Sequence, residues 1–345
     1  MKNESKRTGK RSVTFSHMPC IISEASIAGK KEGEGPLGKC FDCIEEDPML
    51  GKNTWEDAEG ELQKRAAQKV IEKASLKECD IEYLISGDLL GQMIASSFGT
   101  MSLNIPMFGV YGACSTMGEA LSLGAMLVDG GYANRVISMT SSHFAGAEKE
   151  FRFPLAYGNQ RPLSATWTVT GSGAVIIGKK EEDKNPVHIC IKGITTGKVI
   201  DYGIKDSMNM GACMAPAAFD VIVNNLEDFG LYEHEYDQII TGDLGYVGKD
   251  ILLDMLSEKG YAIGDCYMDC GIQIYNKEQQ DTHSGGSGCG CSAITLCGHI
   301  LDRMRKKEWK KVLFVPTGAL LSPVSFNEGN SVPSIAHGVV LEVTE

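Results

Sequence analysis

The sequence predicts an α/β protein built from two related halves with mainly parallel sheets. Strand and helix patterns alternate along the chain, which is typical of this class. A pattern also recurs, since YLISGDL at 83–89 is echoed by QIITGDL at 238–244. A second marker, GACS at 112–115, is echoed by GCS at 290–292. Two markers in the same order indicate a duplication.

The elements of the first half are predicted in order. Residues 12–52 read as a strand and a long loop. Thr54-x-x-Asp57 resembles a capping box at the start of a helix whose apolar residues recur every four positions. Further elements are a strand at 81–86, a helix at 115–129 and a strand at 135–139.

The two predicted halves span residues 12–180 and 186–345. In each, a repeated marker opens an apolar helix that is followed by a basic turn and a hydrophobic strand, RVI at 135–137 and KVL at 311–313. Two such halves are expected to leave a cleft between them, where ligand sites usually lie.

Composition excludes several classes of function. Asp plus Glu outnumber Lys plus Arg by 45 to 33, which argues against nucleic-acid binding. The longest apolar stretch, Ala120–Val128, is far shorter than the roughly 20 residues that a membrane helix needs. The basic residues between Lys2 and Arg11 predict a solvated tail, or a weak contact with an anionic membrane surface.

The chain contains 12 cysteines but no apolar export segment. We therefore expect a reducing cytosol rather than disulfides. Cys40-x-x-Cys43 has no matching second pair, so no structural zinc site is expected and no metal ligands are predicted.

Cys114 is the cysteine best placed to carry chemistry. It lies in YGACST at 111–116, where Gly112 permits a sharp turn with positive φ and a helix begins directly afterwards. Backbone N–H groups at that helix start favour a thiolate, so we expect a lowered pKa and donors for an oxyanion or a carboxylate. A small buried cysteine at a tight turn explains the same pattern equally well.

Several longer motifs carry a resemblance to a known family. They are GPLG at 35–38, SGDLL at 86–90, residues 108–117, TSSH at 140–143, VTGSGAV at 169–175, MAPAA at 214–218, GGSGC at 285–289, TGALLSP at 317–323 and IAHGVV at 335–340. The chain resembles the thiolase fold of thiolases and ketoacyl synthases, and is similar over nearly its whole length to the stage V sporulation protein AD family of spore-forming bacteria. This resemblance implies a layered α-β-α-β-α arrangement with mixed sheets.

The resemblance also implies a function. Members of that family would bind dipicolinic acid, or its calcium chelate, and support its uptake into the forespore and its release in germination. It further implies a homodimer, other stage V sporulation membrane proteins as partners, and a cytoplasmic protein at the periphery of the spore inner membrane.

The catalytic set of thiolase-fold enzymes is incomplete in this sequence. By resemblance, Cys114 takes the nucleophile position and His283 falls where a histidine precedes a Gly-rich turn. The position after the second-half strand is Asp243 rather than His or Asn, and the late strand at 314–318 has no cysteine. Because nucleophilic catalysis needs such partners, a non-catalytic binding protein is favoured. The alternative is an acyl-thioester enzyme that uses Cys114 as nucleophile.

A site for a planar dianion needs cations, fixed donors and a flat apolar wall. The segment 148–161, expected as a loop near Cys114, interleaves Lys149, Arg152 and Arg161 with Phe151, Phe153 and Tyr157. His143 follows a strand end, where α/β sheets place ligand contacts. The predicted ligand-binding residues are Cys114, His143, Arg152, Arg161 and His283.

Calcium is expected only as part of the ligand chelate. Carboxylates such as Asp88 or Asp243 could help to hold it. Both aspartates are also explained as turn residues.

Overall fold

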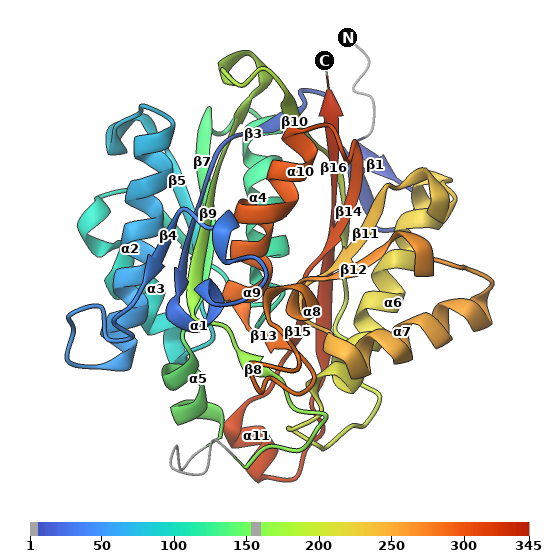
Figure 1. Ribbon diagram of the computed structural model, residues 1–345. Helices are drawn as coiled ribbons and strands as arrows, with labels where there is room; N and C mark the ends of the chain where they lie inside the picture. The colour runs from blue at the N-terminus through green and yellow to red at the C-terminus, as the bar shows by residue number, and fades with distance from the viewer. Residues whose placement is uncertain (1–5, 153–159, 345) are drawn as a thin grey trace.

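The computed structural model describes residues 6–152 and 160–344, which form five layers in the order α-β-α-β-α (Figure 1). Helices α2 (Trp55–Lys73) and α3 (Ile94–Thr100) cover one outer face, and α6 (Met210–Phe229) and α7 (Gly245–Lys259) cover the other. Helices α4 (Thr116–Asp129) and α9 (Cys289–Thr295) lie between the sheets. The predicted layered α/β fold class with mixed sheets is confirmed. The expectation of mainly parallel sheets is wrong, because the strands Gly171–Lys179 and Ser334–Thr344 pair antiparallel with their neighbours on both sides.

Each half contributes five main strands with the same spatial order. The first-half strands, in that order, are β3 (Pro19–Gly29), β9 (Gly171–Lys179), β7 (Arg135–Ser142), β5 (Tyr83–Gly87) and β6 (Met107–Gly109). The second-half strands are β10 (His188–Thr196), β16 (Ser334–Thr344), β14 (Lys311–Val315), β11 (Gln238–Thr241) and β12 (Tyr267–Asp269). If the five strands of each half are numbered along the sequence, both halves have the spatial order first, fifth, fourth, second and third. The motifs that repeat in sequence therefore occupy equivalent positions.

The described residues also form shorter strands and helices. They are β1 (Arg7–Thr8), β2 (Ser12–Thr14), α1 (Lys30–Gly33), β4 (Cys43–Glu45), α5 (Phe144–Phe151), β8 (Trp167–Thr168), α8 (Cys270–Ile274), β13 (Gly286–Ser287), α10 (Leu301–Arg305), β15 (Thr317–Ala319) and α11 (Pro323–Asn327). A π-helical turn at Leu296–Ile300 connects α9 to α10. No helix in the described part of the chain is long and apolar enough to cross a membrane.

The helix and strands predicted between residues 54 and 139 are found with small shifts at their ends, whereas residues 12–52, predicted as one strand and a loop, contain β2, β3, α1 and β4. Thr54 caps α2 as expected, because its hydroxyl accepts a hydrogen bond from the backbone N–H of Asp57 at 3.1 Å. Strand β7 runs three residues further than predicted, to Ser142. Its polar end pairs with β9 and is completely buried. The prediction stopped too early because these strand residues are polar, and a strand is recognised in sequence by its apolar residues.

The N-terminal residues are docked where a solvated tail was expected. The Asp228 carboxylate accepts hydrogen bonds from the backbone N–H groups of Lys10, Arg11 and Ser12 at 2.7–3.0 Å. Arg11 also pairs with Asp220 at 2.6 Å. The expectation is therefore wrong for residues 6–11, while residues 1–5 lie outside the described part of the chain.

The expectation of reduced cysteines is wrong for one pair. Cys20 of β3 and Cys190 of β10 form a disulfide, and both are almost completely buried. They face each other on adjacent antiparallel strands at the seam between the halves. Their separation of 170 residues left no local pattern from which the pairing could be recognised.

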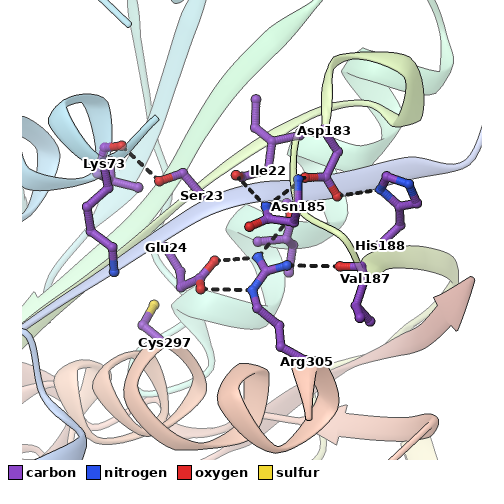
Figure 2. A network of polar contacts seen from close by, with 12 residues as sticks. Ile22, Ser23, Glu24, Lys73, Asp183, Asn185, Val187, His188, Cys297 and Arg305 are labelled. Atoms are coloured by element: carbon purple, nitrogen blue, oxygen red, sulfur yellow. Dashed lines mark hydrogen bonds and ion pairs between the residues drawn. The ribbon is translucent and has the colours of Figure 1, made fainter. Parts of the chain in front are cut away.

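A second connection across this seam centres on Arg305 of α10 (Figure 2). Its guanidinium donates two hydrogen bonds to the Glu24 carboxylate of β3, at 3.1 and 2.7 Å. It also donates to the carbonyl oxygens of Val187 and Ile21 at 3.1 and 3.3 Å. One side chain therefore joins the middle helical layer, the first strand and the segment that links the two halves.

Candidate functional site

A narrow pocket lies between the two halves and contains Cys114. Its walls are mostly apolar, and the described residues that line it include one charged side chain, Arg152, and no histidine, asparagine or glutamine. The lining residues are Leu89, Tyr111, Ala113, Cys114, Ala147, Phe151, Arg152 and Thr168 from the first half, with Met210, Ser287, Gly288, Ala319 and Leu321 from the second.

Cys114 is presented by a tight turn just before α4. The backbone N–H groups of Ser115 and Thr116 donate to the carbonyls of Gly112 and Ala113 at 3.0 and 3.1 Å. The left-handed residue is Ala113, with φ of 49°, and not Gly112 as expected. The turn also needs Gly318 from β15, because a Cβ there would lie 2.1 Å from the Gly112 carbonyl oxygen.

The thiol of Cys114 does not have the lowered pKa that the helix start predicted. Burial raises its pKa well above the ordinary value, and the nearby Asp243 carboxylate raises it further. Only 5% of the residue is exposed, so the thiolate would lose nearly all of its hydration. The sulfur is therefore a neutral thiol at physiological pH.

Asp243 follows β11 and lies behind the pocket wall. Its carboxylate accepts hydrogen bonds from the Ser287 hydroxyl at 2.7 Å, the Gly288 backbone N–H at 3.0 Å and the Thr317 hydroxyl at 2.8 Å. The Ser287 oxygen in turn lies 3.9 Å from the Cys114 sulfur. Near the Cys114 sulfur the structure thus places Asp243 and Ser287, whereas the resemblance assigned the Gly-rich-turn position to His283.

Arg152 is the cation of the pocket. It follows the last residue of α5, pairs with Glu148 at 3.3 Å and donates to the Thr166 carbonyl at 3.3 Å. The Glu148 carboxyl group is fully buried, which raises its pKa, while Arg152 and Arg161 oppose that shift. The predicted loop at 148–161 is wrong at its start, because Glu148–Phe151 belong to α5, and Phe153 and Tyr157 lie outside the described residues.

Arg161 and His283 do not line the pocket. Each contacts the loop that carries the other. Arg161 donates to the Asp281 carbonyl at 2.8 Å, and its guanidinium lies 4.7 Å above the Trp167 ring. His283 pairs with the same Asp281 at 3.0 Å and with the Pro162 carbonyl at 2.9 Å. Arg161 remains close to the site electrostatically, since it acts on the pKa of both Glu148 and Arg152.

His143 supports the pocket from behind. Its Nδ1 accepts a hydrogen bond from the Ala145 backbone N–H at 3.2 Å and caps α5, and its Nε2 lies 2.8 Å from the Pro48 carbonyl oxygen. Burial lowers its pKa, which keeps the ring neutral. Both nitrogens are engaged, so His143 positions the helix that carries Ala147 into the pocket wall.

Neither predicted calcium-holding carboxylate is open to a ligand. Asp88 accepts from the Leu90 and Ser96 backbone N–H groups and from the Ser96 hydroxyl at 2.6–2.9 Å. Asp243 is engaged in the same way by three donors. Across residues 6–152 and 160–344, no group of three or more His, Cys, Asp or Glu side chains is arranged to hold a metal ion.

The chain is similar over nearly its whole length to proteins of one family. The family model described as stage V sporulation protein AD (SpoVAD) matches residues 9–342. A curated relative, stage V sporulation protein AD of Bacillus subtilis (strain 168), is 43% identical over 337 residues, which cover 98% of each chain.

Solved structures show the fold relationship. The 3-oxoacyl-[acyl-carrier-protein] synthase III of Aquifex aeolicus VF5 matches with a TM-score of 0.57 and 15% identity, over 94% of this chain and 99% of that one. Human mitochondrial 3-ketoacyl-CoA thiolase matches with a TM-score of 0.57 and 12% identity, over 95% and 99% of the respective chains. At this identity the likeness concerns the fold alone.

Proposed function

Because this chain belongs to the stage V sporulation protein AD family, a sporulation family with a thiolase-like fold, we propose that it binds dipicolinic acid in the pocket beside Cys114 without covalent chemistry. In this role it supports uptake of dipicolinate into the forespore and its release in germination. The single observation that carries the proposal is a mostly apolar pocket with one cation, beside a cysteine held as a neutral thiol.

The pocket chemistry fits a flat dianion. Tyr111 and Phe151 offer aromatic surface to a pyridine ring, and Arg152 offers a planar fork of donors to a carboxylate. The positive end of the α4 dipole lies near Cys114 and favours an anion in the pocket. Arg161, behind the wall, has two buried nitrogens without a hydrogen-bond partner and adds positive charge to the same region.

Titration calorimetry tests the proposal directly. We expect heat and a 1:1 stoichiometry with dipicolinate, and much weaker binding of pyridine-2-carboxylate, which has one carboxylate fewer. Repeating the titration with calcium asks whether the chelate is the preferred ligand. A flat trace at millimolar dipicolinate, with and without calcium, would defeat the proposal.

The alternative function is acyl transfer through Cys114, which the shared fold with condensing enzymes favours. The neutral, buried thiol argues against it, because the thiolate is the nucleophile in such chemistry. We expect no acyl adduct after incubation with acetyl- or acetoacetyl-coenzyme A, as judged by intact mass. An added acyl group that is absent from Cys114→Ser would establish the alternative.

We also propose that the chain forms a homodimer through the β6 edge of the first-half sheet. Several large apolar side chains near this edge are exposed, namely Phe98, Met101, Phe108 and Tyr111. Exposed patches of this kind mark interaction sites, and an open sheet edge invites strand pairing. Tyr111 also lines the pocket, so a second copy would cover one of its walls.

Sedimentation velocity checks the dimer. Phe108→Asp is expected to shift the protein to monomer, because a carboxylate cannot be buried in an apolar interface without a partner. Tyr232→Asp, at an exposed aromatic of the other half, is the matched control and should leave the dimer intact. A monomeric wild-type protein at micromolar concentration would contradict the proposal.

Attachment to the periphery of the spore inner membrane, through other stage V sporulation membrane proteins, completes the proposal. Calcium in this scheme arrives with the dipicolinate, because Asp88 and Asp243 are already engaged by protein donors. Co-purification with spore membranes that is lost on removal of the membrane partners is the expected result.

A further inference from the structure

Asp243 is a completely buried carboxylate that dipicolinate binding does not use. It lies behind Ser287, which lines the pocket, and it contacts three residues from two separate segments. Burying a carboxylate costs free energy unless its partners compensate. Because Asp243 lies near the Cys114 sulfur, its buried charge can influence the protonation of that thiol.

We infer that the buried Asp243 carboxylate, which lies one serine side chain away from the Cys114 sulfur, disfavours a thiolate there and so keeps the pocket unreactive toward acyl thioesters. This goes beyond the proposed function, because it does not require dipicolinate to be the ligand. It assigns to Asp243 the role of a positioning residue that acts through the thiol.

The hydrogen-bond chain points in one direction. The Ser287 hydroxyl donates its proton to Asp243 at 2.7 Å, while its oxygen lies 3.9 Å from the Cys114 sulfur. The serine contact alone lowers the pKa of Cys114, whereas the Asp243 carboxylate, which is within the reach of the thiol, raises it.

The donors around Asp243 offset part of the cost of burying its charge. Burial raises its pKa, but two hydroxyls and one backbone N–H donate to it. A carboxylate in this state accepts hydrogen bonds only. Its negative charge beside the sulfur opposes formation of a second anion, and the low local dielectric strengthens that repulsion.

Other groups face the sulfur but do not change this balance. The buried Cys289 thiol also raises the pKa of Cys114. Tyr111 and Arg152 lie along the same pocket wall, and the pKa of the Tyr111 hydroxyl is raised by burial. Arg152, which is paired with Glu148, and the start of α4 favour a thiolate. The hydrogen bond from Ser287 also lowers the pKa of Cys114, and burial together with Asp243 outweighs it.

The test is the pH profile of Cys114 alkylation by iodoacetamide, resolved by peptide mass spectrometry on the full chain. Asp243→Asn keeps the size of the side chain and removes the charge. A neighbouring like charge shifts a pKa by roughly one to three units. We therefore expect Cys114 in this variant to react about 10- to 1,000-fold faster at pH 8, with its profile displaced to lower pH.

Thr317→Val is the matched control. It removes one of the hydrogen bonds that lower the pKa of the same carboxylate but does not remove the carboxylate, so its Cys114 profile should move less than that of Asp243→Asn. An unchanged profile in Asp243→Asn, or an equal acceleration in Thr317→Val, would overturn the inference.

The wild-type protein provides a second, independent readout if Asp243→Asn does not fold. Cys40 and Cys79 are exposed thiols in the same molecule. Cys114 should react far more slowly than either at pH 8 and approach them only in strong alkali. Equal rates at pH 8 would overturn the inference, whereas a flat dipicolinate titration would affect the proposed function alone.

Discussion

Replacing Arg152 by glutamine is expected to weaken dipicolinate binding by about 1.5–3 kcal/mol, the value of a hydrogen bond to a charged group. Arg152 is the charged side chain among the described residues that line the pocket. Its loss also leaves the Glu148 carboxyl group buried without its ion-pair partner. A dianion would then face an uncompensated acid, so both effects lower affinity.

Lys149→Gln separates this effect from a general loss of positive charge. Lys149 lies three residues earlier, on α5, and is half-exposed, and it pairs with Glu56 on α2 rather than facing the pocket. Its replacement should leave affinity within about twofold, because exposed ion pairs contribute little. Calorimetric titration of both variants gives the comparison. Equal affinities for Arg152→Gln and the wild type would remove Arg152 from the site.

The second large effect concerns stability. Arg305→Ala is expected to lower the free energy of unfolding by about 2–4 kcal/mol, since it leaves the mostly buried Glu24 carboxylate unpaired and two carbonyl oxygens without their donor (Figure 2). The substitution removes all four hydrogen bonds of the Arg305 guanidinium at once. Urea unfolding, followed by circular dichroism, measures the change.

Arg303→Ala is the control on the same helix. Arg303 forms an exposed ion pair with Glu308, so its removal should cost well under 1 kcal/mol. Arg305→Lys keeps the charge but loses the planar fork, and should fall between Arg305→Ala and the wild type. A loss for Arg305→Ala no larger than that for Arg303→Ala would show that the contacts to Glu24 do not support the fold.

The fold could be predicted from the sequence because its signals are local and repeated. The apolar spacing of α2, its Thr54 cap and the two copies of the GDL motif each specify backbone geometry within a few residues. The α5 segment could not be predicted, because its helix depends on a cap by His143, whose other nitrogen is fixed by Pro48 from a distant loop.

The candidate site was predictable only in part for a related reason. Cys114 and Arg152 were correctly placed beside each other, because a helix start and a basic aromatic segment both have sequence patterns. Ser287 was missed in favour of His283, four residues earlier in the same Gly-rich stretch, because serine carries no pattern of its own. The pKa of Cys114 depends on Asp243, 129 positions away in the chain, which no local rule includes.

The division of the pocket wall between the two halves has a thermodynamic consequence. Leu89 and Phe151 belong to one half, and Met210 and Leu321 to the other, so a ligand between them contacts both halves at once and stabilises their association. Occupancy then favours the closed assembly over any state in which the halves separate, and melting should shift upward with ligand concentration as mass action requires. Neither half expressed alone would complete the receptor, and mixing the two would restore it only where they reassociate.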